Sequence, residues 1–355
     1  MGYTKEDVIN FINEEDVKFI RLTFCDLKGI QKNISIMPNE LEKAFSKGIL
    51  IDSSFVDGYE KNKRIVLHPD SNTISVLPWR PSQGRVVRMF CDLTTVDGEE
   101  IKESGRRLLK KAIKDNEDVD IKLKTEFEFY LFKSDDEGRK TSIPYDEAGY
   151  MDIAPEDKGE NIRREICLSL DEMEIATSGS HHAEGPGQNR ISIVEEAPLK
   201  AAENAITFES VVKTMATRNG LFADFSHIVK EDEPVSKHKI VIKAEKDKLK
   251  KYYVNLLKHY DEIYLFLNNT DYLYCDYDDK SNVFYDEYND EIDIERVSYT
   301  SNSYIAYALV LYAINDERIT NTKKAYTLQD AKNIAKESEF IKGIVPKEIL
   351  EEFVK

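Results

Sequence analysis

The order of apolar and polar residues divides the chain into two units. The first, residues 1–97, is predicted to be a small sheet with one helix packed on it, after an N-terminal helix. Thr4 and Asp7 form the capping-box pattern that starts this N-terminal helix. Alternating positions and turn residues then predict strands over 17–27, 31–37, 73–79 and 85–95, and a short helix over 38–49.

The second unit, residues 98–355, alternates helices with strands. An amphipathic helix over 103–116 opens it, and a long helix over 199–220 has its apolar side chains on one stripe and stops at Gly220. Further helices are predicted over 159–174, 246–269, 302–316 and, as two short helices, 327–355. Strands are predicted over 121–132, 189–195 and 237–245.

Composition and charge narrow the classes of function. Hydrophobic residues make up 41% and charged residues 33%, which is typical of a soluble protein. A net charge of −17 repels nucleic acid and anionic lipid, so neither a nucleic acid nor a membrane is an expected partner. The N-terminal stretch lacks the order of a signal peptide, and no apolar run is long enough for a membrane span. No CxxC pair exists, which favours reduced thiols in a cytoplasmic protein; the cysteines are Cys25, Cys91, Cys167 and Cys275.

The composition changes after Gly220. The next glycine is Gly343, and the segment 271–295 contains ten acidic residues and one lysine. Phosphate sites need the backbone N–H groups of glycine-rich turns and positive side chains. This half of the chain has no glycine between Gly220 and Gly343, and beyond Arg218 its only arginines are Arg296 and Arg318. Whether the acidic segment is ordered against the sheet or loose in solvent stays open.

Two short motifs carry candidate chemistry. On a strand, Glu126 and Glu128 share one face. If buried, two such carboxylates need a divalent cation, a guanidinium or a shared proton, whereas a solvated polar face is the structural alternative. The stretch HHAEGPGQNRISI, residues 181–193, places His181 and His182 before a Gly-Pro-Gly turn. Histidines there are metal ligands or simply packed side chains.

In order, these segments resemble type I glutamine synthetase along nearly the whole chain. VKFIRLTFCDLKGIQKNISIMPNELEKAF is similar to the family's N-terminal β-grasp segment, IDSSFVDGY to its D-G-S-S motif, and KTEFEFYLF to its metal-binding strand. RREICLSLDEME and HHAEGPGQNRISI resemble the histidine-containing segment, and SNSYIAYALVLYAI and SEFIKGIVPKEILEEFV resemble later helices. Each motif is modest, but their order and spacing together are specific.

The resemblance implies an α+β fold. A β-grasp N-terminal domain, residues 1–97, would precede a larger catalytic-like α/β domain of the glutamine synthetase type, residues 98–355, whose antiparallel strands form a bowl. Family members form rings with each active site between neighbours, and they use ATP and Mg²⁺ or Mn²⁺ to join glutamate to ammonia. Asp52 corresponds to the residue that a neighbour contributes for ammonium, although by itself it could simply begin a turn.

Compared residue by residue with the family, the bowl has lost metal ligands. Glu126 and Glu128 are kept, but two of the three carboxylates that hold one ion fall on Ala183 and Arg190. A hard dication needs roughly six oxygen ligands. We therefore predict that Arg190 pairs with Glu128 or Glu126 and takes the place of the ion. If one residue is deleted, His238 is the remaining metal histidine, now vestigial.

The nucleotide-binding parts diverge as well. The family's P-G-Y-E-A-P flap and R-N-R-S-P arginines have no counterpart in this sequence. Two further family arginines fall on Glu291 and Glu295, and a metal-binding glutamate falls on Asp293. Carboxylates at these positions are expected to repel a triphosphate.

These substitutions predict a homologue without ATP-dependent glutamate–ammonia ligase activity, acting as a binding, regulatory or co-assembly subunit. It would form a homo-oligomeric ring, or a hetero-oligomer with an active glutamine synthetase, in the cytoplasm. No cofactor is expected. The alternative is an enzyme of the family with altered or residual ligase chemistry, which would use ATP with Mg²⁺ or Mn²⁺. The side chains expected to line the site are His181, His182, Ala183, Gln188 and Arg190.

Overall fold

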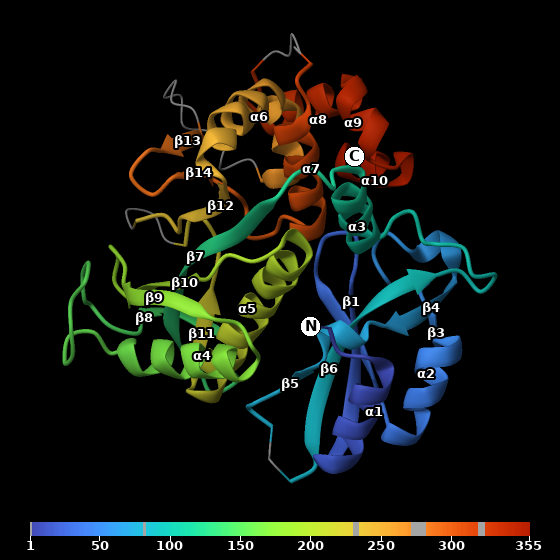
Figure 1. Cartoon of the computed structure of the whole chain (residues 1–355). Coiled ribbons are helices and arrows are strands. Elements are labelled where there is room, and N and C mark those ends of the chain that lie inside the picture. Colours follow the sequence, from blue (N-terminus) through green and yellow to red (C-terminus); the bar gives the residue numbers. More distant parts are fainter. Residues whose placement is uncertain (1, 81–82, 230–233, 271–281, 319–323) are drawn as a thin grey trace.

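A computed structural model describes residues 2–80, 83–229, 234–270, 282–318 and 324–355, which form two domains (Figure 1). In the N-terminal domain a six-stranded sheet has the order β2-β1-β6-β4-β3, and β5 also pairs with β6. Its strands are β1 (Val17–Cys25), β2 (Gln31–Ile36), β3 (Ile49–Asp52), β4 (Arg64–Pro69), β5 (Ser75–Val76) and β6 (Arg85–Thr94). The helices α1 (Lys5–Glu14) and α2 (Leu41–Lys47) supply apolar side chains to the core of this domain. Three short 3-10 turns are η1 (Pro38–Glu40), η2 (Glu60–Asn62) and η3 (Ser71–Thr73).

The predicted cap of the first helix is confirmed. The Thr4 hydroxyl accepts a hydrogen bond from the backbone N–H of Asp7, and the Asp7 carboxylate accepts one from the backbone N–H of Thr4. From this start α1 buries Val8 and Ile12 against the sheet. Local sequence and packing agree here, which explains why the pattern alone located the helix.

The C-terminal domain is built on an eight-stranded sheet. Its strand order is β13-β14-β12-β7-β10-β9, with β11 and β8 also paired to β7. The strands are β7 (Ile121–Ser134), β8 (Lys140–Pro144), β9 (Thr177–His182), β10 (Gln188–Ile193), β11 (Leu221–Asp224), β12 (His238–Ala244), β13 (Val283–Asp286) and β14 (Glu291–Glu295). Every pairing in this sheet is antiparallel. The long strand β7 is central to this sheet, because it pairs with β8, β10, β11 and β12.

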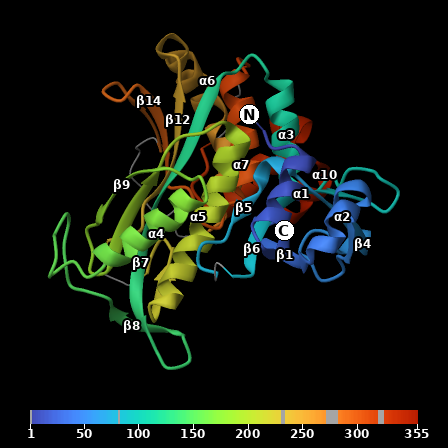
Figure 2. The ribbon, with the colours of Figure 1, turned by 60° about the horizontal axis from the view of Figure 1, so that its bottom comes forward.

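Two groups of helices surround this sheet (Figures 1 and 2). The helices α4 (Glu160–Glu172) and α5 (Pro198–Arg218) pack on the face that carries Phe127, Phe129 and Ile191. A larger core joins the other helices to one end of the sheet: α3 (Gly105–Asp115), α6 (Lys246–Leu267), α7 (Ser303–Asn315), α8 (Leu328–Glu337), α9 (Glu339–Ile344) and α10 (Lys347–Phe353). Within the described residues no helix is both long enough and apolar enough to cross a membrane.

The structure corrects the sequence-based elements in several places. The C-terminal stretch 327–355 forms three helices, α8 to α10, where two were predicted. The pattern of apolar and polar positions did not predict seven strands: β3, β4, β8, β9, β11, β13 and β14. Of the acidic segment 271–295, residues 271–281 lie outside the described residues, and the remainder contains β13 and β14. This part of the segment is thus ordered at one edge of the sheet.

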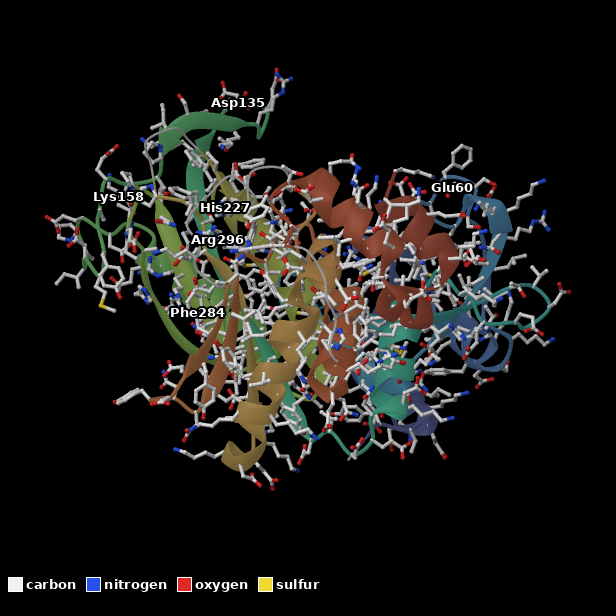
Figure 3. All side chains as sticks on the ribbon, turned by 90° about the horizontal axis from the view of Figure 1, so that it is seen from above. Glu60, Asp135, Lys158, His227, Phe284 and Arg296 are labelled. Atoms are coloured by element: carbon white, nitrogen blue, oxygen red, sulfur yellow. The ribbon has the colours of Figure 1, made fainter. Side chains whose placement is uncertain are left out.

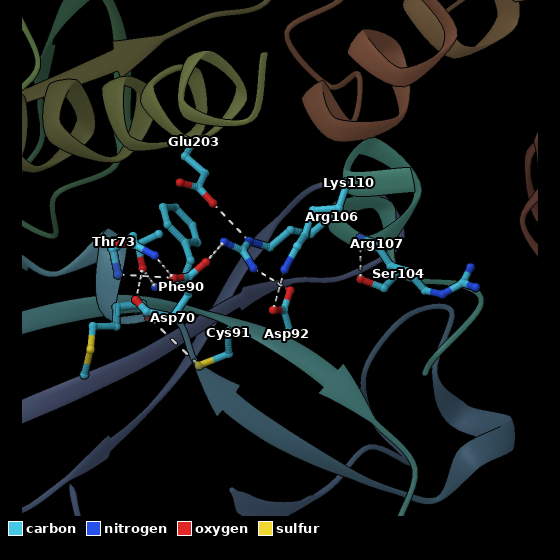
Figure 4. A network of polar contacts seen from close by, with 12 residues as sticks. Asp70, Thr73, Phe90, Cys91, Asp92, Ser104, Arg106, Arg107, Lys110 and Glu203 are labelled. Carbon is cyan, nitrogen blue, oxygen red and sulfur yellow. Dashed lines mark hydrogen bonds and ion pairs between the residues drawn. The ribbon is translucent and has the colours of Figure 1, made fainter. Parts of the chain in front are cut away.

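A buried arginine links the two domains (Figure 4). Arg106, on α3, is 4% exposed. Its guanidinium donates to Glu203 on α5 at 2.9 Å and to Asp70 beside η3 at 2.7 Å, and it also pairs with Asp92 on β6. Burial of a charge is tolerated when its hydrogen bonds are satisfied, as they are here. The pairs fix how the N-terminal sheet sits against α3 and α5.

Removal of this guanidinium should destabilise the protein strongly. In the substitution Arg106→Met, Glu203 would remain buried without its partner, so we expect a loss of about 3–5 kcal/mol in the free energy of unfolding. Arg107→Met is the matched control, because Arg107 pairs with the exposed Glu100 and should contribute less than about 1 kcal/mol. Urea unfolding measures both. Equal effects of the two substitutions would contradict the role assigned to Arg106.

Candidate functional site

The candidate site lies on the face of the C-terminal sheet opposite α4 and α5. Alternation along β7 turns Glu126 and Glu128 toward this face. In the cross-strand register Arg190 of β10 lies opposite Glu128, and Lys239 of β12 lies opposite Glu126. His181 of β9 lies opposite Arg190. These five side chains line the centre of what we call the bowl.

Three cations surround the Glu126 carboxylate. Lys124 donates to it at 2.9 Å, the Lys239 Nζ lies 3.5 Å away, and Arg190 donates a short hydrogen bond. Burial opposes ionisation of Glu126, but the hydrogen bond from Lys124 and the charges of Lys239 and Arg190 outweigh it and lower its pKa to about 2. Glu126 is therefore a carboxylate at any physiological pH.

Glu128 has a different environment. Its Oε2 accepts hydrogen bonds from the backbone N–H of Lys237 at 2.7 Å and from the Gln188 amide at 3.2 Å. Its Oε1 lies 3.7 Å from the Arg190 Nη1. Burial raises the pKa of Glu128, and the hydrogen bond from Lys237 and the charge of Arg190 offset only part of that effect. Arg190 thus pairs with Glu126 and also contacts Glu128, and the predicted pairing is confirmed.

Two of the three acidic residues of β14 are also paired. Lys239 Nζ lies 2.7 Å from the Asp293 Oδ2, and Lys243 Nζ lies 3.7 Å from the Glu291 Oε2. Burial and the nearby charge of Asp293 raise the pKa of Glu291. The sequence suggested unopposed carboxylates at this edge. The structure shows lysines of β12 beside two of them, which weakens the expected repulsion of a triphosphate.

The bowl does not fit the divalent cation that the resemblance implies. Two carboxylates on β7 face three positive side chains, Lys124, Arg190 and Lys239. Ala183 lies across the hairpin from Gln188, with its N–H bound to the Gln188 carbonyl, and offers no side-chain ligand. Hard dications require several oxygen ligands, most of them anionic or water. Among the described residues, the only group of three metal-binding side chains within reach of one another lies elsewhere.

That group is Asp146, Asp157 and His182. His182 lies on the core face of β9, not in the bowl, so its prediction as a bowl-lining residue is wrong. Its Nε2 contacts Asp146 at 2.9 Å, and its Nδ1 contacts the Ala183 carbonyl at 2.9 Å. Asp157 pairs with the buried guanidinium of Arg163. The three side chains are already paired with protein groups, as in a structural network.

The structure also turns His238 away from the bowl. His238 lies opposite Phe127 on the core face of the sheet, and its Nε2 contacts the Glu128 backbone carbonyl at 2.8 Å. Burial lowers its pKa to about 4. His238 is therefore a neutral core side chain, and its assignment as a vestigial metal ligand is wrong. The next residue, Lys239, is the one that enters the bowl.

Asp52 lies far from the bowl of its own chain. It ends β3 in the N-terminal domain, on the other side of the molecule from β9 and β10 (Figure 1). In a view from above, Glu60, which begins η2 shortly after β3, is separated from His227 and Lys158 by the helical core (Figure 3). The Asp52 carboxylate is exposed and accepts a hydrogen bond from the backbone N–H of Ser54 at 2.9 Å.

Lys124 and Lys239 were not predicted from the sequence as residues of the site. They lie in the stretches KLKTEFE and KHKIVIK, in which charged residues recur at alternate positions. Such alternation usually marks a strand face that is exposed to solvent. The signal that could have found them is the pairing of two strands that carry complementary charges at every second position. It becomes informative only when the register Glu126 to Lys239 is known.

Comparison with known proteins identifies the family. A family model described as glutamine synthetase, catalytic domain, matches residues 102–238, and one described as glutamine synthetase, beta-Grasp domain, matches residues 16–96. Together the two matches cover more than half of the chain. The chain belongs to the glutamine synthetase family. The predicted family and fold class are thereby confirmed, and members of the family are metal- and ATP-dependent enzymes.

Curated relatives carry the name glutamine synthetase. That of Clostridium saccharobutylicum is 41% identical over 227 residues, which is 63% of this chain and 51% of the relative. That of Staphylococcus aureus (strain N315) is 39% identical over 228 residues, with the same coverage. The chain spans about half the length of the curated relatives it matches. Their similarity favours an enzyme, and the expectation that this chain takes no cofactor finds no support there.

Solved structures share the fold over nearly the whole chain. The structure described as "Apo GmaS without ligand" has a TM-score of 0.83 at 18% identity and covers 98% of this chain and 94% of that one. "CryoEM Plasmodium falciparum glutamine synthetase" has a TM-score of 0.83 at 14% identity and covers 100% of this chain and 95% of that one. The glutamine synthetase fold thus continues past residue 238, where the family model ends.

The charge of Glu126 should make stability depend on pH. Its folded pKa of about 2 lies below the ordinary 4.5, so its contribution is complete above about pH 5 and is lost as the pH falls toward 2. That contribution is on the order of 2–3 kcal/mol. Urea unfolding from pH 7 to pH 3 measures it. The loss of stability in Glu126→Gln should shrink as the pH falls.

Glu184→Gln is the control for this experiment. Glu184 pairs with Lys237 at 2.7 Å, but its side chain is 51% exposed, so the substitution should cost less than about 1 kcal/mol at every pH. A difference between the native chain and Glu126→Gln that stays constant from pH 7 to pH 3 would contradict the role of the charge.

Proposed function

We propose that this glutamine synthetase homologue lacks ATP-dependent glutamate–ammonia ligase activity and acts as a binding, regulatory or co-assembly subunit. The observation that carries the proposal is the guanidinium of Arg190, which bonds Glu126 and lies 3.7 Å from Glu128. In the family the resemblance implies a carboxylate at this position and another at Ala183. Here the two remaining carboxylates hold an arginine.

Electrostatics supports this proposal. At about 4 Å and an effective dielectric constant of about 20, a unit positive charge beside a dication costs roughly 8 kcal/mol. Arg190 alone imposes such a cost, and Lys239, 3.5 Å from Glu126, adds to it. Loss of carboxylate ligands further reduces the affinity for Mg²⁺ or Mn²⁺. Ligation through a metal-bound phosphate has no support in this arrangement.

Assembly is the proposed route to function. Asp52 is exposed at the end of β3 and lies far from its own bowl, as a residue offered to a neighbouring subunit would. A homo-oligomeric ring, or a hetero-oligomer with an active glutamine synthetase, would place it at a neighbour's site. In a hetero-oligomer the chain would complete another subunit's site while its own bowl remained without nucleotide. We place this assembly in the cytoplasm.

A second candidate is a ligase of the family with altered or residual activity on glutamate or an amine. The observation that favours it is the identity of about 40% to relatives named glutamine synthetase. Such an enzyme would require ATP and Mg²⁺ or Mn²⁺ in the bowl. The two candidates differ in whether the native chain binds the metal, so metal binding separates them.

Metal binding should appear only after the lost carboxylates are restored. Titration calorimetry of the native chain with Mn²⁺ and ATP is expected to show no binding in the bowl. Ala183→Glu combined with Arg190→Glu should bind Mn²⁺, because the substitutions supply two ligands and remove the guanidinium. Arg190→Lys with Ala183→Glu is the matched control that keeps the positive charge and should not bind. Metal-dependent binding of ATP or γ-glutamyl transfer by the native chain would establish the ligase instead.

Co-assembly with an active synthetase gives a further expected outcome. When the chain is coexpressed with the Clostridium saccharobutylicum relative, native mass spectrometry should find assemblies that contain both subunits. Asp52→Asn should leave their assembly unchanged but lower the activity per active subunit, because the carboxylate and not the fold is altered. Homomeric assemblies alone, across a range of expression ratios, would count against the co-assembly role.

A further inference from the structure

A cavity of about 470 Å³ lies away from the bowl, between the N-terminal domain and the end of α4. Its size is within the range of pockets that hold small organic molecules. The apolar part of the lining comes from both domains: Val8 and Phe11 of α1, Ile74 and Val76 at β5, and Met173 just after α4. A molecule in this cavity would contact both domains at once.

The polar part of the lining is acidic. Asp7, Glu172 and Glu174 line the cavity, and the described lining contains no lysine or arginine. Asp7 is committed to the cap of α1. Glu174 accepts a hydrogen bond from the Tyr3 hydroxyl at 3.2 Å and keeps its second carboxylate oxygen free of described partners. The side chain of Glu172 forms no hydrogen bond or ion pair with any described residue. Two carboxylates are therefore available to a ligand.

The wall of the cavity on the N-terminal side is held in place. The Ser71 hydroxyl donates to the Tyr3 backbone carbonyl at 2.7 Å. Gly2 packs so closely against Asn72 that an added Cβ would come within 2.2 Å of the Asn72 Oδ1. Together with the bond from Tyr3 to Glu174, these contacts span from the η3 turn to the end of α4. The cavity is formed before any ligand binds, which lowers the cost of binding.

We propose that this cavity binds a small organic ammonium ion, with its apolar part against Val8, Phe11 and Met173 and its charged nitrogen beside Glu172 and Glu174. The exposed carboxylates of Glu172 and Glu174 have no cationic partner in the lining and can pair with an ammonium group, while the apolar part of the lining disfavours a bare metal ion. The net charge of −17 favours the approach of cations. The site is independent of the bowl and of the function proposed for it.

The test uses the full chain and two probes of similar shape. Isothermal calorimetry and saturation-transfer NMR compare 2-phenylethylammonium with 3-phenylpropionate. The ammonium ion should bind at least fivefold more tightly than the carboxylate. The double substitution Glu172→Gln and Glu174→Gln should weaken its binding about fivefold, since partly exposed ion pairs contribute up to about 1 kcal/mol. Asp171→Asn, next to Glu172 but outside the lining, is the matched control and should leave binding unchanged.

A second variant guards against a change in the fold. Ile74→Trp places a large side chain in the cavity without altering any charge, and it should abolish binding of 2-phenylethylammonium while circular dichroism remains native. Three results overturn the proposal: no binding of the ammonium probe, equal binding of the two probes, or binding that survives both the double substitution and Ile74→Trp. Because the bowl is untouched in these variants, none of these results depends on the ligase question.

Discussion

The ion pair between Arg190 and Glu126 determines what the open face of the C-terminal sheet can hold. β7 presents two carboxylates two residues apart, so their charges lie on one face and repel each other. In a buried setting this repulsion is relieved by a positive group between the carboxylates or by a shared proton. The register of β10 supplies that group from the protein itself, because Arg190 lies opposite Glu128. Lys124 and Lys239 complete the neutralisation around Glu126.

The scaffold under this face explains why the pair can form without distortion. Phe127, Phe129 and Ile191 alternate with the bowl residues and pack against α5, which keeps β7 and β10 in register. Arg106 holds the N-terminal sheet against the same helix through Glu203. A substitution in the bowl therefore changes charge on a fixed surface. The fold and the chemistry of the face are separable, as is usual for sites placed on stable folds.

The sequence alone supported the family, the fold class and the pairing of Arg190, because these depend on motif order and on the charge of one residue. It could not place His182 and His238, since a strand turns alternate side chains to opposite faces and an assumed one-residue deletion decides which face His238 takes. Lys239, the neighbour of His238, carries the charge that enters the bowl. The strands β13 and β14 were missed because they lie in the acidic segment 271–295, whose order the sequence left open, although the alternation of acidic residues and isoleucines in β14 is itself a strand pattern.

An identity of about 40% to named synthetases is compatible with an arginine in the bowl, because the identity describes the whole alignment and the arginine describes one site. Identity is an average over 227 residues, and two substitutions hardly change it. Relative to the glutamates that the resemblance implies, Ala183 and Arg190 together change the charge of the bowl by three units. A dication carries only two. The change of charge at these two positions thus exceeds the whole charge of the ion, although the same two positions hardly affect the overall identity. The electrostatics of the bowl, and not overall similarity, must therefore decide whether this chain binds a metal.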